Sequence, residues 1–222
     1  MARLPVGAAF RITNRILLDN PDAFAALIAV EALSFSLWPI EGRDFLLPAA
    51  LGVLVLAMPV TIATIAAANQ ACHGEHVRLA DALGTIVPRY LPVIGAVVCS
   101  GLMVGAGLIL LVIPGVIAAA LQFVALPVCV IERLGPVASL KRSVALCRGE
   151  LWRVLGIAAA CVAVTLAVSI ANAELLAGSP FPQAVLSWIW DALSTVYGLV
   201  LSVVVYSFLT TTTASSASTP SA

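Results

Sequence analysis

The side chain with the clearest chemical potential is Glu31, an acidic residue inside the apolar run 22–40. If that run crosses a bilayer, a charged side chain at its centre costs about 2.5–3.5 kcal/mol on insertion scales. Glu31 must therefore face protein or water, or be protonated. Two interpretations stay open: a site for a proton, cation or polar substrate group, or a neutral carboxyl group hydrogen-bonded to a neighbouring helix.

Three more polar side chains lie in or beside apolar runs in the second half of the chain. Asn172 and Glu174 come near the end of one run, and Asp191 comes near the start of the next. Adjacent antiparallel helices can bring Glu174 and Asp191 together, and paired carboxylates bind cations or raise one another's pKa. The alternative is that these side chains reach water and headgroups at a membrane surface.

The run 72–76, Cys-His-Gly-Glu-His, holds four potential metal ligands in five residues. So compact a run rarely arranges the tetrahedral geometry that zinc prefers. Its histidines are also three residues apart, whereas the His-Glu-x-x-His motif places them four apart. We therefore predict a solvated loop and no metal site.

We predict no enzymatic activity and no cofactor. The sequence has no Gly-x-Ser-x-Gly elbow, Walker loop or dinucleotide-binding fingerprint. No nucleophile can be paired with a base, and no polar stretch is long enough for a separate catalytic domain. An intramembrane enzyme would need Glu31, Glu174 and Asp191 in one enclosed cavity.

The composition indicates which elements position these residues. Hydrophobic residues make up 62% of the 222 residues and charged residues only 10%, whereas about 25% of a soluble domain is charged. A bilayer as the solvent explains the missing charge. Basic and acidic residues balance at eleven each, so the net charge gives no reason to expect nucleic acid as a partner.

The apolar runs predict an all-α integral membrane protein with six transmembrane helices, because each span needs about 20 apolar residues. The third and fourth runs are separated only by Ile113-Pro114-Gly115. Proline lacks the donor that a continuing helix needs and glycine favours a turn, so we expect a hairpin there. The six predicted spans are 22–40, 46–68, 91–112, 115–132, 152–174 and 185–209.

The basic residues set the predicted orientation. Ten of the eleven fall on one side of these spans and only Arg43 falls on the other, which places both termini in the cytoplasm. Residues 1–209 then form a single transmembrane domain. Residues 210–222 are rich in serine, threonine and alanine and carry no charge, which predicts a disordered cytoplasmic tail.

A short amphipathic segment precedes each pair of spans on the cytoplasmic side. Apolar residues recur every three or four positions in 8–19, 77–87 and 136–148, with polar or basic residues on another face. Such a pattern is typical of a helix lying in the membrane interface. We therefore predict three hairpins, each preceded by a cytoplasmic interfacial helix.

The third amphipathic segment and its flanks concentrate basic charge. Each lysine or arginine near an anionic membrane surface contributes about 1 kcal/mol, so we predict contact with lipid headgroups. The alternative is that these charges only fix the topology. The predicted contact residues are Arg133, Lys141, Arg142, Arg148 and Arg153.

The central part of the chain, roughly residues 105–155, resembles a bacterial family. The family is named for the membrane domain of glycerophosphoryl diester phosphodiesterases. The resemblance implies a six-helix fold in the bacterial plasma (inner) membrane, and an enzyme only where a separate hydrolase domain is attached. This chain departs from the family pattern at Val144 and Cys147. The matching residues are Leu111-Val112-Ile113-Pro114-Gly115, Ala125-Leu126-Pro127, Glu132, Gly135-Pro136, Ser139-Leu140-Lys141-Arg142-Ser143 and Arg148-Gly149.

The predicted function is a non-enzymatic membrane protein that organises or contacts anionic lipids or membrane partners through its basic interfacial helices. Membrane lipids are the expected partners, with a membrane protein or a second copy of the chain as further candidates. The alternative is a transporter or flippase for a lipid or amphipathic small molecule. Glu31 and the proline at position 59 favour that alternative, because transporters combine repeats with broken helices and midplane polar groups.

Overall fold

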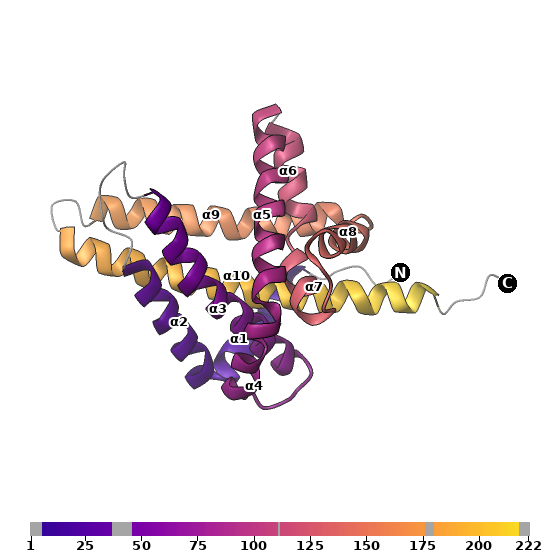
Figure 1. The fold of residues 1–222 in the computed structure, drawn as a ribbon, viewed down its shortest axis with the longest axis horizontal. Coiled ribbons are helices and arrows are strands. Elements are labelled where there is room, and N and C mark those ends of the chain that lie inside the picture. The colour runs from indigo at the N-terminus through magenta and orange to yellow at the C-terminus, as the bar shows by residue number, and fades with distance from the viewer. Residues whose placement is uncertain (1–5, 37–45, 111, 176–179, 218–222) are drawn as a thin grey trace.

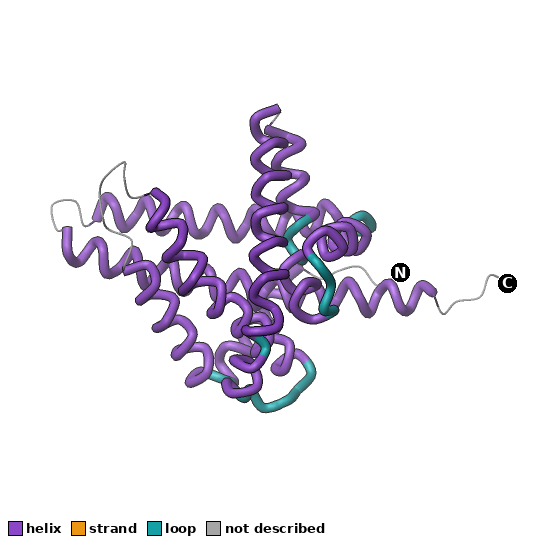
Figure 2. Tube along the Cα trace, in the orientation of Figure 1, coloured by secondary structure: helices purple, strands orange, loops and turns teal. Residues whose placement is uncertain are grey.

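The computed structural model describes residues 6–36, 46–110, 112–175 and 180–217. All the regular structure in these ranges is helical, and short loops join the helices (Figure 2). The predicted all-α fold class is therefore confirmed. Positions 37–40 of the first predicted span and Arg43 lie outside the described residues.

Three helices in the described ranges are long and apolar enough to cross a membrane: α5 (Ile86–Leu110), α9 (Leu151–Leu175) and α10 (Pro180–Ala217). The first two predicted runs form α2 (Pro21–Ser36) and α3 (Leu46–Cys72). Helix α3 continues through Pro59 without interruption.

Helix α10 lies at the centre of the molecule and packs against α2, α3 and α9 (Figure 1). Its residues Val196, Val200 and Val203 are buried in the main core together with Phe24 of α2 and Ile65 of α3. Helices α5 and α6 (Val112–Leu121) pack on each other and run across the direction of α9 and α10 (Figure 1). The helices therefore do not form one parallel bundle.

The fourth predicted span, 115–132, is interrupted. Its residues form α6 and then α7 (Ala125–Ile131), separated by a turn at 122–124. The prediction of one continuous helix was wrong because Pro127 lies in the first turn of α7. Proline cannot donate to the carbonyl four residues earlier and its ring clashes with it, so an uninterrupted helix is disfavoured there.

The turn before α6 also lies earlier than predicted. Helix α5 ends at Leu110 and α6 begins at Val112, so Pro114 and Gly115 lie inside α6 and not in the turn. Proline is accepted in the first turn of a helix, where its missing N–H would have no helical partner. The residue between the two helices is outside the described ranges.

All three amphipathic segments are helical. They form α1 (Val6–Asp19), α4 (Leu79–Gly84) and α8 (Pro136–Cys147). Gly135 is the N-cap of α8 and Pro136 its first residue, a position that suits proline because its missing N–H would have no helical partner there. Helix α4 is shorter than the predicted segment because α5 already begins at Ile86.

Helix α8 buries a different face from the one that its apolar spacing indicates. Val137 is exposed, whereas Ser139 and Ser143 are buried with Leu140 and Cys147. The two serines are satisfied by hydrogen bonds: Ser139 donates to the carbonyl of Pro136 at 2.7 Å, and Ser143 donates to that of Leu121 at 2.6 Å. The second bond ties α8 to the end of α6, just before the turn at 122–124.

The C-terminal tail differs from the prediction as well. Residues 210–217 are helical and continue α10, whereas 218–222 lie outside the described residues. Thr210, Thr211 and Thr212 donate their hydroxyl hydrogens back to carbonyls of the preceding turn, including those of Tyr206 and Ser207. These local bonds satisfy the polar side chains within the helix, so the polar composition does not break it.

Among the described glycines, Gly95 of α5 is the one that packs closely against another helix. A Cβ atom on Gly95 would lie 2.6 Å from Cγ of Pro136, the first residue of α8. The proline ring is stiff and cannot move aside without moving α8. Gly95 is therefore required for α8 to dock on α5.

We predict that Gly95→Ala destabilises the protein by about 1–3 kcal/mol, the usual cost of overpacking. Gly101→Ala is the matched control, because Gly101 lies in the same helix and has no described atom within 4 Å of an added Cβ. Thermal unfolding in one detergent measures both variants. If Gly95→Ala unfolds at the same temperature as Gly101→Ala, the close packing of α5 and α8 is refuted.

Candidate functional site

The side chain of Glu132 joins three helices at the end of α7. Glu132 is the C-cap of α7. Nε of Arg142, on α8, donates to both carboxylate oxygens at 3.2 Å. The hydroxyl of Tyr206, on α10, donates to Oε1 at 3.0 Å. Tyr206 is only 9% exposed, so α7 and α8 are anchored to the central helix at this carboxylate.

Two of the five predicted headgroup contacts are therefore engaged inside the chain. Arg142 is paired with Glu132, and Nη1 of Arg153 lies 3.1 Å from Oε2 of Glu150. A paired arginine offers less free charge to a lipid than an unpaired one. The sequence could not show this, because Glu132 is ten residues from Arg142 and has no helical spacing to it.

Lys141 and Arg148 are the predicted contacts that remain on the exposed face of α8 and its last turn. Neither forms an ion pair with a carboxylate in the part of the chain that is described. Val137 lies one turn before Lys141 and is 57% exposed, and Trp152 at the start of α9 is 79% exposed. Cations flanked by exposed apolar and aromatic side chains are typical of a surface at a membrane interface.

Arg133, the fifth predicted contact, has an unusual backbone. Its φ of 57° places a non-glycine residue in the left-handed region, directly after the end of α7. Glycine usually occupies such a position, because other residues pay about 1–2 kcal/mol for the conformation. The chain enters α8 three residues later, and the Arg133 side chain lines a pocket.

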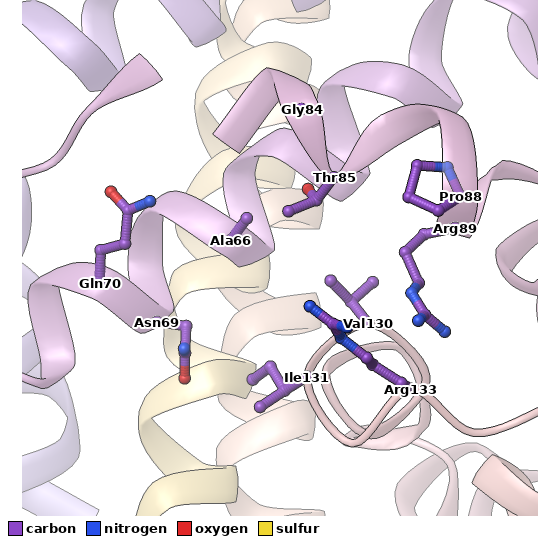
Figure 3. A pocket seen from close by; sticks show the side chains of 10 residues that line it. All are labelled: Ala66, Asn69, Gln70, Gly84, Thr85, Pro88, Arg89, Val130, Ile131 and Arg133. Carbon is purple, nitrogen blue, oxygen red and sulfur yellow. The ribbon is translucent and has the colours of Figure 1, made fainter. Parts of the chain in front are cut away.

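This pocket, which we call the arginine pocket, has a volume of about 290 Å³ and lies between α3, α7 and the start of α5. Arg133 extends from the end of α7 toward α3, and Arg89 reaches the same space from α5 (Figure 3). Gln70 lines the opposite side, and its Oε1 accepts the backbone N–H of Arg78 at 2.9 Å. The remaining lining residues are Ala66, Asn69, Gly84, Thr85, Pro88, Val130 and Ile131.

The arginine pocket carries positive charge without a carboxylate to balance it. No acidic side chain lines it. Neither Arg89 nor Arg133 forms an ion pair within the described residues. Arginine has only donors and stays charged, so the pocket offers two cationic groups that can bind an anion.

A family model described as a domain of unknown function, DUF7847, matches residues 26–217. The chain belongs to this family. Comparison with curated proteins and with solved structures found no match. The matched region contains α8, the Glu132 network and the arginine pocket, so these features lie in the DUF7847 domain. The resemblance to the phosphodiesterase membrane-domain family stays a prediction.

The predicted intramembrane polar residues of the DUF7847 domain are dispersed. Glu31 is buried, at 3% exposed, and its Oε2 has no hydrogen-bond partner in the described structure. Asn172 is half-buried and Glu174 is exposed near the end of α9. Asp191 is half-buried on α10, where its neighbour Trp190 lies across from Thr165.

The structure places Glu174 and Asp191 on two different helices, α9 and α10. Glu174 is nine residues beyond Thr165 along α9, a rise of about 13 Å at 1.5 Å per residue. No group of three His, Cys, Asp or Glu side chains in the described ranges is arranged to hold a metal ion. Glu31, Glu174 and Asp191 therefore do not form the enclosed cluster that an intramembrane enzyme would need.

The run 72–76 consists of Cys72, the last residue of α3, and the loop that follows it. His73 Nδ1 lies 2.8 Å from the carbonyl oxygen of Asn69, and Gly74 adopts a φ of +73°.

Cys147, where the resembled family has serine or threonine, is buried on α8. Burial raises its pKa to about 11, against a smaller opposite effect of the hydrogen bond with Ser143. The thiol is protonated at neutral pH and is not a nucleophile there.

Sequence reasoning missed the arginine pocket. In the sequence, Arg89 contributes only to the uneven distribution of basic charge, and Asn69 and Gln70 belong to no recognisable motif. The one local signal is a pair of adjacent amides at the end of a long apolar run. The left-handed backbone of Arg133 has no sequence signature, because glycine would be expected there.

The Glu132 network predicts unequal roles for two tyrosines of α10. Tyr206→Phe removes a hydrogen bond to a charged acceptor, which should cost about 1.5–3 kcal/mol. Tyr197→Phe removes a hydrogen bond to the neutral Oδ1 of Asn14, 3.0 Å away, and should cost about 1 kcal/mol or less. Unfolding in detergent compares the two variants. Equal stabilities would show that the Tyr206 hydroxyl does not anchor α7.

Proposed function

We propose that the chain is a non-enzymatic membrane protein that contacts anionic lipid headgroups through the basic surface of α8. In this proposal six helices span a bacterial plasma membrane in three antiparallel pairs, with both termini in the cytoplasm. The spans are α2, α3, α5, α6 with α7, α9 and α10. The proposed partners are membrane lipids, with a second copy or another membrane protein as further candidates.

The pairwise packing of the apolar helices supports the hairpins of this proposal, whereas the direction of α5 and α6 across α9 and α10 (Figure 1) does not support all six helices crossing one bilayer together. Helices α2 and α3, α5 and α6, and α9 and α10 pack on each other as pairs. Helix α9 presents Val162, Leu166 and Ile170 unburied, each more than half exposed. A row of large apolar side chains without cover in the chain is costly in water and favourable in lipid.

The exposed face of α8 is the observation that carries the lipid contact. Lys141 and Arg148 are free of carboxylates in the described structure, and Val137 and Trp152 beside them are exposed. Each cation near an anionic surface contributes about 1 kcal/mol, while the apolar side chains enter the acyl boundary. The proposed orientation places this face on the cytoplasmic leaflet, where anionic lipids attract it.

Transport of a lipid or amphipathic molecule is a second candidate, favoured by the interruption between α6 and α7. Gln122 lies in that turn at 7% exposure, and neither of its amide atoms has a hydrogen-bond partner in the described ranges. Broken helices with polar groups inside the membrane are a feature of transporters. Flux in proteoliposomes separates this function from lipid contact, which predicts none.

The lipid contact predicts that Lys141→Gln/Arg148→Gln lowers the preference of the protein for phosphatidylglycerol over phosphatidylcholine. Spin-labelled lipids in reconstituted bilayers measure this preference by electron paramagnetic resonance. We expect a several-fold decrease at low ionic strength, and a smaller difference at high salt because screening weakens the attraction.

Glu150→Gln/Arg153→Gln is the control for this experiment. It removes an ion pair of the same region without changing the net charge, so the lipid preference should stay near that of the unaltered protein. The proposed role of α8 would be contradicted if Lys141→Gln/Arg148→Gln left the preference for phosphatidylglycerol unchanged. It would also be contradicted if the control lowered this preference equally.

A further inference from the structure

The arginine pocket differs from the α8 surface because two arginines from different parts of the fold line one partly open cavity. Arg89 and Arg133 come from different helices and reach the same cavity of about 290 Å³ (Figure 3). Surface cations attract many headgroups weakly, whereas converging donors in a cavity hold one anion in a defined geometry. The pocket therefore has the form of a binding site.

The carboxylate nearest in sequence is prevented from neutralising the pocket. Glu132 directly precedes Arg133, but both its oxygens are engaged by Arg142 and one also by Tyr206. Glu75 and Asp81 line a neighbouring pocket on the other side of Gln70 and do not line this one. The two guanidinium groups therefore keep their charge available for a ligand.

The backbone of Arg133 indicates that its side chain is needed for more than folding. Glycine would adopt the left-handed conformation at this position without strain. Strained residues at ligand sites are a recurring feature of proteins, and the strain at Arg133 places a guanidinium group across the pocket (Figure 3).

We propose that the arginine pocket binds one phosphate group through Arg89 and Arg133. A carboxylate has two oxygens, which one guanidinium fork can occupy, whereas a phosphate presents oxygens to arginines on two sides. The volume is at the lower end of the range of about 300–1,000 Å³ for ligand pockets, which suits a small phosphate-bearing group. Asn69 and Gln70 add neutral amide groups to the lining.

The ligand is a phosphate ester of a lipid headgroup or a free phosphate, since both present the same oxygens. The site is separate from Lys141 and Arg148, so it does not depend on the lipid contact of α8. Phosphate binding in the pocket can therefore fail while the lipid contact of α8 holds. Equally, the lipid contact of α8 can fail while phosphate binding in the pocket holds.

Isothermal titration of the full-length protein in detergent with inorganic phosphate, and with a short-chain phosphatidic acid, tests the site. We expect saturable binding of at least one of these ligands, weakened at least tenfold by Arg89→Gln and by Arg133→Gln. Arg11→Gln makes the same change in charge on α1, outside both the pocket and the α8 surface, and should leave the affinity within twofold. Equal weakening in all three variants, or no saturable binding of either ligand, overturns the proposal.

The two ligands distinguish the sources. Phosphatidic acid binding at least tenfold more tightly than inorganic phosphate assigns the site to a lipid headgroup. Comparable affinities assign it to free phosphate. In both cases the losses in Arg89→Gln and Arg133→Gln must be seen with the ligand that binds.

Arg133→Gly separates ligand binding from a structural role. Glycine relieves the left-handed strain, so without ligand this variant should unfold at the same or a higher temperature than the unaltered protein. It should nevertheless lose phosphate affinity at least tenfold, as Arg133→Gln does. If Arg133→Gly keeps its phosphate affinity, Arg133 does not bind the ligand and the proposal fails.

Discussion

The hydrogen-bonded ion pair at Glu132 is the interaction on which the basic end of the molecule depends. One carboxylate receives donors from α8 and α10, so the end of α7 is fixed to both the amphipathic helix and the central helix. The bond from Ser143 to Leu121 and the contact of Pro136 with Gly95 then hold α8 against α6 and α5. The exposed face of α8 and the arginine pocket are positioned on either side of this junction.

The same interaction divides the charges of a protein whose net charge is zero. Glu132 forms an ion pair with Arg142, and Glu150 forms one with Arg153. These two arginines therefore contribute more to the structure than to the positive potential at the surface. Lys141 and Arg148 stay exposed on one side, and Arg89 and Arg133 line the pocket on the other. Pairing therefore converts a balanced composition into a locally basic surface, which is the property that matters for an anionic partner.

Hydropathy and periodicity were sufficient to predict most helices. The apolar runs became α2, α3, α5, α9 and α10, and the three amphipathic segments became α1, α4 and α8. Local rules also placed the start of α8 at Gly135-Pro136. The interruption before α7 could have been predicted from Pro127, because its effect on a helix is local.

Features that depend on distant parts of the chain could not be predicted. Ser143 is buried because its acceptor, the carbonyl of Leu121, lies on another helix. The arginine pocket combines residues around 69, 89 and 133, which only the fold brings together. The separation of Glu174 and Asp191 depends on how far α9 and α10 overlap, which the positions of polar residues alone do not set.

On this account, the basic end of the protein binds phosphate-bearing anions of the membrane. Native mass spectrometry tests this binding most directly, on protein released gently from its own membranes. The account predicts an anionic phospholipid retained at fixed stoichiometry, and its loss from the variant Arg89→Gln/Arg133→Gln/Lys141→Gln/Arg148→Gln. A bare protein with only bulk lipids, or the same lipid retained undiminished by that variant, would contradict it.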